Sequence, residues 1–340
     1  MTIKDLARLT NTSPATVSLA LNGKSGVSAA TRDRILKAAE ENGYILPKRA
    51  VPVPGNMIRL VAISKPNTSG IHNFRTTFFA EIINYMQLRC AELNYSMIYS
   101  VVSHADFLQE IRNLESIQPS NGMIILGTYL EDSEVASLRQ LPIPFVLLDR
   151  NCTPHSLNSV SINNFAGAYL AVESLVSRGH SRIGYVSSSP NVFNLDERRS
   201  GFLAALQQHG LSLESQNVFP SNSYSTDGVE RLKKALAACP EIPSAFFCEN
   251  DYTALSLVSA LTQMGFSVPG DVSVIGFDDV PECQLTIPSL STVHVDRQAM
   301  STAAVDRIHC LISSPNSTAQ STLINVSVTI RSSIRDNSDR

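Results

Sequence analysis

The side chains best placed for chemistry in this sequence are acids and an amide that directly follow β-rich runs. They are Asp149, the triplet Glu249-Asn250-Asp251 and the pair Asp278-Asp279. Ligands of open parallel sheets bind outside the carboxyl ends of the strands, so these groups could hydrogen-bond a polar ligand there. Each could equally be a helix cap or an ordinary loop residue, and position alone leaves both interpretations open.

Motifs of familiar reaction chemistry are absent from the sequence. It has no P-loop, no G-x-S-x-G, no H-E-x-x-H and no dinucleotide fingerprint. Its seven histidines are dispersed, and its six cysteines lack the C-x-x-C spacing that indicates zinc or redox work. We therefore expect a protein that is not an enzyme and that needs no metal or cofactor.

Charge is divided unevenly along the 340 residues. Up to Gly55 there are eight Lys and Arg against four Asp and Glu, a net +4, and the remaining 19 basic and 26 acidic residues give −7. A basic module attached to an acidic body is typical of DNA-binding proteins. The first twenty residues contain Lys4, Asp5 and Arg8 instead of an apolar signal core, so we expect the protein in the cytoplasm.

Three short helices are predicted in the basic N-terminal module. The first follows Thr2, Ser13-Pro14 begins the second, and Ser28 caps the third, which stops at Asn42-Gly43. On spacing alone, the three could form a structural bundle or a DNA-binding helix-turn-helix. The residues expected to face inward are Ile3, Leu6, Ala7, Val17, Leu21, Ile35, Leu36 and Ala39.

From Ile58 onward, β-rich runs alternate with helical ones, which predicts an α/β fold with parallel sheets. The strands are too many for one sheet, and the polar segments 159–163 and 290–295 are predicted to cross between two lobes. Strands are predicted at 59–64, 95–102, 122–126, 145–149, 183–187, 245–248 and 272–277, and helices at 79–92, 105–117, 164–178, 196–209, 226–238 and 251–264.

Several runs resemble the lactose/galactose repressor (LacI/GalR) family of transcriptional regulators over nearly the whole chain. In the N-terminal module they are the runs 2–7 and 13–23, Val27-Ser28 and Thr31-Arg32. In the larger part they are the runs 179–185, 198–202, 249–251 and 272–279. The resemblance implies a helix-turn-helix headpiece and a bilobed, periplasmic-binding-protein-like domain of two parallel-sheet lobes.

The resemblance also assigns roles to individual residues. Asp149, Arg198, Asn250 and Asp278 match positions that hydrogen-bond a small effector in the cleft, whereas Val295 stands where sugar-responsive relatives are often polar. The positions that match DNA contacts are the base-reading Pro14, Ala15 and Leu19 and the phosphate-binding Ser13, Thr16, Ser18, Asn22 and Ser28. Pro14, Ala15 and Leu19 offer no side-chain hydrogen bond to a base, so part of the specificity must come from DNA shape or other residues.

The connector departs from the family pattern. Pro52 and Pro54 disfavour the hinge helix that the family usually places there, and we expect an extended strap with Lys48 and Arg49 available to DNA. The expected domains are a headpiece at 1–45, a connector at 46–57, an effector-binding and dimerisation domain at 58–335 and a tail at 336–340. One lobe is expected from 58–160 and 293–321, the other from 161–292 and 322–335.

The predicted function is repression of transcription by a homodimer that binds a double-stranded DNA operator and responds to a small, sugar-like effector. A regulator controlled by a corepressor or a protein partner is the alternative. A solute-binding protein would share the bilobed core but has no use for a headpiece.

Overall fold

The computed structural model describes residues 3–21, 26–42, 55–64, 76–152, 155–189, 192–221 and 227–336. The chain divides into two compact units, Met1–Val53 and Pro54–Arg340. Each unit is described by itself. Within the described residues, no helix is both long and apolar enough to span a membrane.

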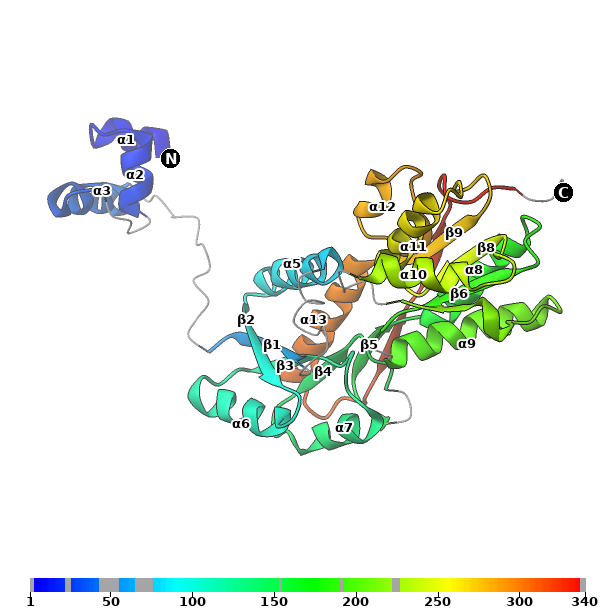
Figure 1. Cartoon of the computed structure of the whole chain (residues 1–340). Helices are drawn as coiled ribbons and strands as arrows, with labels where there is room; N and C mark the ends of the chain where they lie inside the picture. Colours follow the sequence, from blue (N-terminus) through cyan, green and yellow to red (C-terminus); the bar gives the residue numbers. More distant parts are fainter. Residues whose placement is uncertain are drawn as a thin grey trace. The chain divides into compact units, whose positions relative to one another are not determined.

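The N-terminal unit contains three helices, α1 (Ile3–Leu9), α2 (Pro14–Leu21) and α3 (Ala29–Glu41), labelled in Figure 1. Its core consists of Leu6, Ala7, Val17, Ala20, Ile35 and Ala39, with Leu21 partly buried against it. The inward position predicted for Leu36 is wrong, because its side chain is 40% exposed. Ala20 lies in this core although it was not predicted to face inward. The side chain of Ile3 is not among those described.

Two six-stranded sheets form the larger unit, as the number of predicted strands indicated (Figure 1). The first sheet is fully parallel. The second is parallel except for β12, which pairs antiparallel with β10. In spatial order the first sheet contains β11 (Ser321–Ile324), β5 (Ser159–Ile162), β4 (Phe145–Leu148), β3 (Gly122–Leu126), β1 (Met57–Ser64) and β2 (Ser96–Ser103), and the second contains β12 (Val326–Thr329), β10 (Ser291–Val295), β9 (Ser273–Asp278), β8 (Ala245–Cys248), β6 (Ile183–Ser187) and β7 (Val218–Pro220).

Helices cover both faces of the first sheet, which explains why its central strands are buried on both sides. In β1, Leu60 faces the core beneath α5 (Thr77–Glu92) and α13 (Arg297–Ser313), whereas Val61 faces α6 (Phe107–Ile117) and α7 (Asp132–Ser137). The helices that pack with the second sheet are α8 (Asn164–Val176), α9 (Phe193–Gln208), α10 (Gly228–Ala237), α11 (Asp251–Gln263) and the short α12 (Glu282–Leu285). Short 3₁₀ turns follow α7 at Leu138–Gln140 and precede β7 at Ser215–Asn217.

The chain passes between the two lobes three times. It leaves the first sheet after β5, returns after β10 and leaves again between β11 and β12. The first two passages occur at Asn163 and Asp296, whose side chains accept hydrogen bonds from the backbone amides that begin α8 and α13, at 3.2 and 2.8 Å. Each of these two passages therefore ends in a capped helix that fixes its direction.

The two polar segments predicted as crossings, 159–163 and 290–295, are themselves largely buried strands, and the chain crosses directly after each. Ser161 Oγ is buried without a partner among the described residues, whereas the hydroxyls of Ser159 and Ser291 are paired, which makes these polar strand residues tolerable in the core. Ser159 Oγ lies 3.1 Å from Ser321 Oγ, and Ser291 Oγ accepts from the backbone amide of Arg331 at 2.8 Å. The helices α7, α12 and α13 and the strands β7, β11 and β12 were not predicted from the sequence either.

Close packing of α8 against α9 depends on Gly201. A Cβ atom built there would lie 2.0 Å from the backbone oxygen of Phe165 on α8. Because backbone atoms cannot turn away as a flexible side chain can, we expect Gly201→Ala to force the two helices apart and lower the free energy of unfolding by about 1–3 kcal/mol. Ser200→Ala, at an exposed position one residue earlier, is the control and should change stability little. Urea unfolding of both variants measures this, and equal stability of Gly201→Ala and wild type would contradict the packing argument.

Candidate functional site

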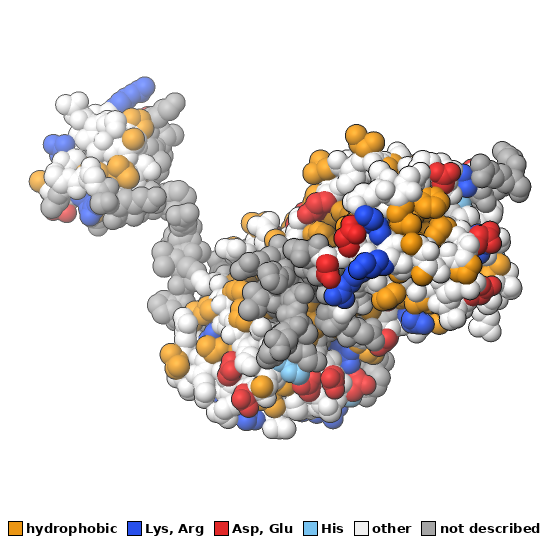
Figure 2. All heavy atoms as spheres, in the orientation of Figure 1, with side chains coloured by type: hydrophobic (Ala, Val, Ile, Leu, Met, Phe, Trp, Pro, Cys, Tyr) orange, Lys and Arg blue, Asp and Glu red, His pale blue; other side chains and the backbone are white. Residues whose placement is uncertain are grey.

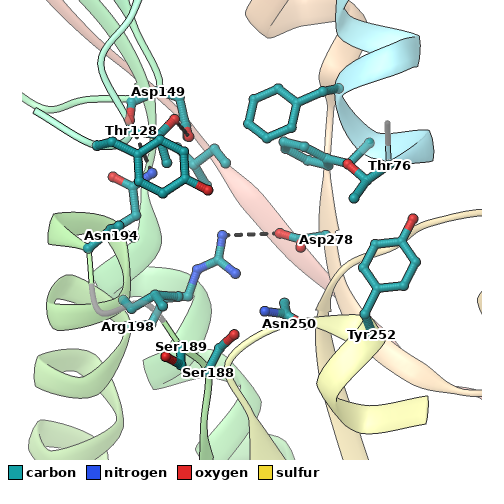
Figure 3. A pocket seen from close by; sticks show the side chains of 16 residues that line it. Thr76, Thr128, Asp149, Ser188, Ser189, Asn194, Arg198, Asn250, Tyr252 and Asp278 are labelled. Atoms are coloured by element: carbon teal, nitrogen blue, oxygen red, sulfur yellow. Dashed lines mark hydrogen bonds and ion pairs between the residues drawn. The ribbon is translucent and has the colours of Figure 1, made fainter. Parts of the chain in front are cut away.

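A pocket lined by both polar and apolar side chains lies between the two lobes of the larger unit (Figure 3). Water-sized molecules have access to about 80 Å³ of it, and the whole hollow, open solvent included, measures about 640 Å³. The four effector-site residues predicted from the sequence all line it, although they come from four separate parts of the chain. They are Asp149 after β4, Arg198 on α9, Asn250 after β8 and Asp278 at the end of β9.

Asp149 is held in place from both lobes. Its backbone has φ +62°, a left-handed conformation that turns the chain sharply at the end of β4. Thr128 donates its hydroxyl to Asp149 Oδ2 at 2.7 Å, and Asn194 Nδ2 on α9 donates to the Asp149 carbonyl at 3.1 Å. The carboxylate is 4% exposed, so it lies in a desolvated place where hydrogen bonds to a ligand would be strong.

Arg198 connects three strand ends through one guanidinium. Its Nε donates to Asn164 Oδ1 at 2.9 Å, and its two terminal nitrogens donate to the carbonyl of Glu249 at 2.5 Å and to Asp278 Oδ1 at 3.0 Å. The guanidinium carbon also lies 3.7 Å from the ring centroid of Phe277. A buried cation is costly unless it is paired, and these contacts supply the pairing.

Asp278 lies opposite Arg198 in Figure 3, across the pocket floor. Its φ of +115° and that of Asp279, +54°, show a strained turn directly after β9. Arg297 stabilises this turn, because one terminal nitrogen donates to the Asp278 carbonyl at 2.6 Å and the other to the Asp279 carbonyl at 3.1 Å. The side chain of Asp279 points to other partners, Arg331 at 2.6 Å and His294 at 2.8 Å, and does not line the pocket.

Asn250 and Asp251 have different tasks although they are neighbours. Asn250 Oδ1 caps α11 by accepting from the Thr253 amide at 2.9 Å, and the residue also lines the pocket. The suggestion that Asp251 caps the same helix is wrong. Asp251 instead braces two other segments, accepting from the Thr292 hydroxyl at 2.6 Å and from the Val280 amide at 3.0 Å.

Burial raises the pKa of the pocket acids. It raises the pKa of Asp149 to about 6, against the opposing effects of the Thr128 hydrogen bond and the Arg198 charge. For Asp278, burial raises the pKa while Arg198 lowers it. Burial and the nearby Asp278 together raise the pKa of Asp251. The pocket therefore disfavours the charged form of these carboxylates. A ligand that donates hydrogen bonds to them would stabilise that form.

The sequence analysis missed most of the remaining pocket wall. Four aromatic residues line it, Phe78 and Phe79 at the start of α5, Tyr129 after β3 and Tyr252 on α11. A double aromatic at a helix start is an ordinary core signal, so only the fold reveals this role. The other polar residues of the wall are Thr76, Thr128, Ser188, Ser189 and Asn194. Val295 is buried and is not among the lining residues.

The N-terminal unit presents the start of α2 on its surface. Ser13 Oγ accepts from the Thr16 amide at 3.0 Å, and Ser28 Oγ accepts from the Thr31 amide at 3.3 Å, so both serines cap their helices as predicted. Pro14 and Ala15 are exposed, and the next three predicted contacts along α2 are partly exposed: Thr16, Ser18 and Leu19. On the face shown in Figure 2, the charged side chains of this unit are mainly Lys and Arg, whereas the larger unit carries both signs.

Some predicted features lie outside the described residues. They are Asn22, Lys48 and Arg49 among the DNA contacts, the connector up to Pro54 with Pro52, Gly43 at the end of the third helix and nearly all of the tail.

A three-helix unit with an exposed, capped second helix, joined in one chain to a two-lobed unit with a pocket between its lobes, is the arrangement of a DNA-binding regulator. Comparison with known proteins supports this class. Residues 2–46 match the model of bacterial regulatory proteins of the lacI family, and residues 172–334 match the periplasmic binding protein-like domain.

Relatives match along most of the chain. The repressor CytR of Escherichia coli K12 is 31% identical, covering 88% of this chain and 87% of its own, and the probable repressor ExuR of Bacillus subtilis 168 is 29% identical over 98% of both. The solved lac repressor dimer bound to operator and the anti-inducer ONPF has a TM-score of 0.72 at 24% identity over 98% of both chains, which shows the same fold. The chain belongs to the LacI family. It is a DNA-binding transcriptional repressor and not an enzyme.

The raised pKa of Asp149 predicts an unusual gain of stability on mutation. At pH 8 the ionised carboxylate opposes folding, because its pKa is higher in the folded chain than in the unfolded one. Asp149→Asn removes this charge while its amide oxygen can still accept from Thr128. The free energy of unfolding of the ligand-free protein should therefore rise by about 1–3 kcal/mol at pH 8, and the gain should fade as the pH drops from about 6 to 4.

Urea unfolding at pH 8 and pH 4.5 tests this prediction. Asp106→Asn, at an exposed acid before α6, serves as the control and should change little at either pH. A loss of stability in Asp149→Asn at pH 8 would show that the folded protein favours the charged form of Asp149.

Proposed function

We propose that this repressor is controlled by a small, neutral, hydroxyl-rich effector that binds in the interlobe pocket. Asp149, Arg198, Asn250 and Asp278 are the proposed effector contacts. The observation that carries the proposal is their convergence from both lobes on one buried site, with a guanidinium and two carboxylates among them. A ligand that contacts both lobes favours the lobe arrangement in which all its contacts are made, and so shifts the population of the protein.

The pocket chemistry supports a sugar-like ligand. Carboxylates accept hydrogen bonds from hydroxyl groups, and the faces of Phe78, Phe79, Tyr129 and Tyr252 suit the apolar C–H face of a sugar ring. Two solved structures of the same fold, at 22% and 21% identity, contain cellobiose and ribose. Control by a corepressor is the alternative, and it predicts that the purified protein binds operator only when the ligand is added.

For the DNA end, we propose that α2 enters the major groove. Pro14, Ala15 and Leu19 would face base edges, while the phosphate contacts would be Ser13, Thr16, Ser18, Asn22 and Ser28, with Lys48 and Arg49 of the connector. The proposed domain limits remain 1–45, 46–57 and 58–335. The capping role of Ser13 and Ser28 is compatible with a phosphate contact, because a hydroxyl that accepts from an amide can also donate.

A charge placed on the exposed start of α2 tests this DNA contact. Ala15→Glu places a negative charge at an exposed position of α2 and should reduce operator affinity at least tenfold, because phosphates and base edges would repel it. Leu9→Glu adds the same charge at a position of α1 that is 59% exposed, and should weaken binding much less. Sites mapped across the genome supply the operator, and affinities are compared at one salt concentration. Equal losses in both variants would contradict the assignment of α2.

A homodimer is the proposed assembly, because one three-helix unit makes too small an interface for high affinity. Exposed apolar side chains support a contact with a second copy through the free edge of the first sheet. Tyr99 and Val101 on β2 are 43% and 49% exposed, and Leu88 on the neighbouring α5 is 55% exposed. An unpaired edge strand with apolar side chains is a ready surface for such pairing.

Replacing these side chains should disrupt the dimer. Tyr99→Asp combined with Val101→Asp should give a monomer in sedimentation at micromolar concentration, because two buried charges would face each other across the interface. The same variant should bind an isolated half-site as wild type does and lose the advantage of a palindrome. Leu323→Asp, at a 44% exposed position on the opposite edge of the sheet, is the control. A variant that remains dimeric would place the interface elsewhere.

A further inference from the structure

A buried acid that does not line the pocket lies directly behind its wall. Glu249 follows β8 and is only 3% exposed. Its carboxylate accepts one hydrogen bond from the hydroxyl of Tyr185 on β6 and another from the backbone amide of Ser188. Ser188 and Ser189 form the part of the pocket wall below Arg198 in Figure 3, so Glu249 holds this wall from behind.

Glu249 is also joined to the pocket through its main chain, because its carbonyl accepts from Arg198 at 2.5 Å. The Tyr185 ring cannot follow a displaced carboxylate, since it is fully buried and packs on Phe202 and Phe247 at centroid distances of 4.9 and 5.8 Å. If the Glu249 carboxylate moves or gains a proton, the hydrogen bond to the Ser188 amide must therefore change.

We propose that Glu249 is a positioning residue of the effector pocket, whose ionised carboxylate holds the Ser188-Ser189 wall and whose protonation loosens it. The pocket wall is thereby sensitive to pH. This inference rests on the proposed function, because the wall matters to regulation only if the pocket binds an effector.

The two hydrogen bonds explain why protonation loosens the wall. Both carboxylate oxygens accept, and the backbone amide of Ser188 can only donate. A proton on the oxygen that faces Ser188 would place two donors against each other. A proton on the other oxygen would turn the Tyr185 hydroxyl into an acceptor and leave a neutral carbonyl for Ser188, and hydrogen bonds to neutral acceptors are roughly half as strong as those to charged ones.

The groups around Glu249 indicate that its carboxylate gains a proton near neutral pH. Burial raises the pKa of Glu249 to about 7, against the Ser188 and Tyr185 hydrogen bonds and the charges of Arg198 and Arg199 on α9. The two guanidiniums stay charged across this range. Burial raises the pKa of Tyr185, and it raises that of the preceding Cys248 well above its usual range. Burial also raises the pKa of Asp251, two residues further on, to about 7, so Glu249→Gln is needed to assign a change of charge between pH 6 and 8 to Glu249.

The amide of Ser188 reports this change directly and needs no ligand. The full chain is labelled with ¹⁵N-serine, and the Ser188 cross-peak is identified by its loss in Ser188→Ala. Between pH 8.5 and 5.5 we expect a sigmoidal change of its amide proton shift with a midpoint near pH 7. Glu249→Gln should abolish the titration, whereas Glu92→Gln, at a 63% exposed side chain on α5, should leave it unchanged.

A second variant covers the case in which Glu249→Gln does not fold. Tyr185→Phe removes a hydrogen bond that lowers the pKa of Glu249, so the midpoint should move to higher pH. A Ser188 amide that does not titrate, a titration that persists in Glu249→Gln, or a midpoint unmoved in Tyr185→Phe would each overturn the proposal. Loss of the titration would leave the proposed function intact, whereas failure of the chain to bind an operator would refute that function without affecting the titration.

Discussion

The pocket depends on one buried guanidinium. Arg198 lies in a desolvated place where an unpaired charge would be prohibitive, so every neighbour that pairs with it is fixed by that requirement. Asn164 at the start of α8, the Glu249 carbonyl after β8 and Asp278 after β9 are the groups that meet it. Two strand ends of the second lobe and the crossing that follows β5 of the first sheet are thereby held at one point, and the pocket is assembled around that point.

The same network reaches the first lobe. Glu197, the residue before Arg198, accepts from Asn164 and from Asn151 of the first lobe, each at 3.2 Å. At the opposite side of the pocket, Thr77 at the start of α5 donates its hydroxyl to Glu282 of the second lobe at 2.5 Å. A ligand that displaces or reinforces groups around Arg198 therefore acts on contacts that set the separation of the lobes, which is the kind of two-state element that allosteric control needs.

Most of the fold follows from patterns that are local in sequence. Seven of the twelve strands in the described residues, β1 to β4, β6, β8 and β9, were predicted from β-rich runs, which the central strands owe to the covering of both faces of a parallel sheet. The strands β5 and β10 were predicted as crossings, because serines are typical of loops. The sequence does not show that Ser159 and Ser291 have hydrogen-bond partners distant in the chain. The omission of α13 is different, because Met300, Ala304 and Ile308 already follow a helical spacing.

The candidate site was predictable only in part. The acids after strands could be named from position, and Arg198 from family resemblance, but the aromatic wall could not, since Phe78 and Phe79 read as core residues. The contact of Glu249 with Ser188 joins residues 61 positions apart and carries no sequence signal. The site forms because strand ends that are distant in the sequence lie close together in the fold, and the sequence alone does not show which ends those are.

The most direct test of the account is the effect of the ligand on operator affinity in wild type and in Asp149→Asn, measured by DNA titration at one salt concentration. Genes that neighbour the mapped operators suggest the ligands to try. For wild type, the account predicts a ligand-dependent change in operator affinity of about 5- to 150-fold. For Asp149→Asn it predicts the same ligand-free affinity and no response. A normal response in this variant would contradict the claim that the interlobe pocket controls DNA binding.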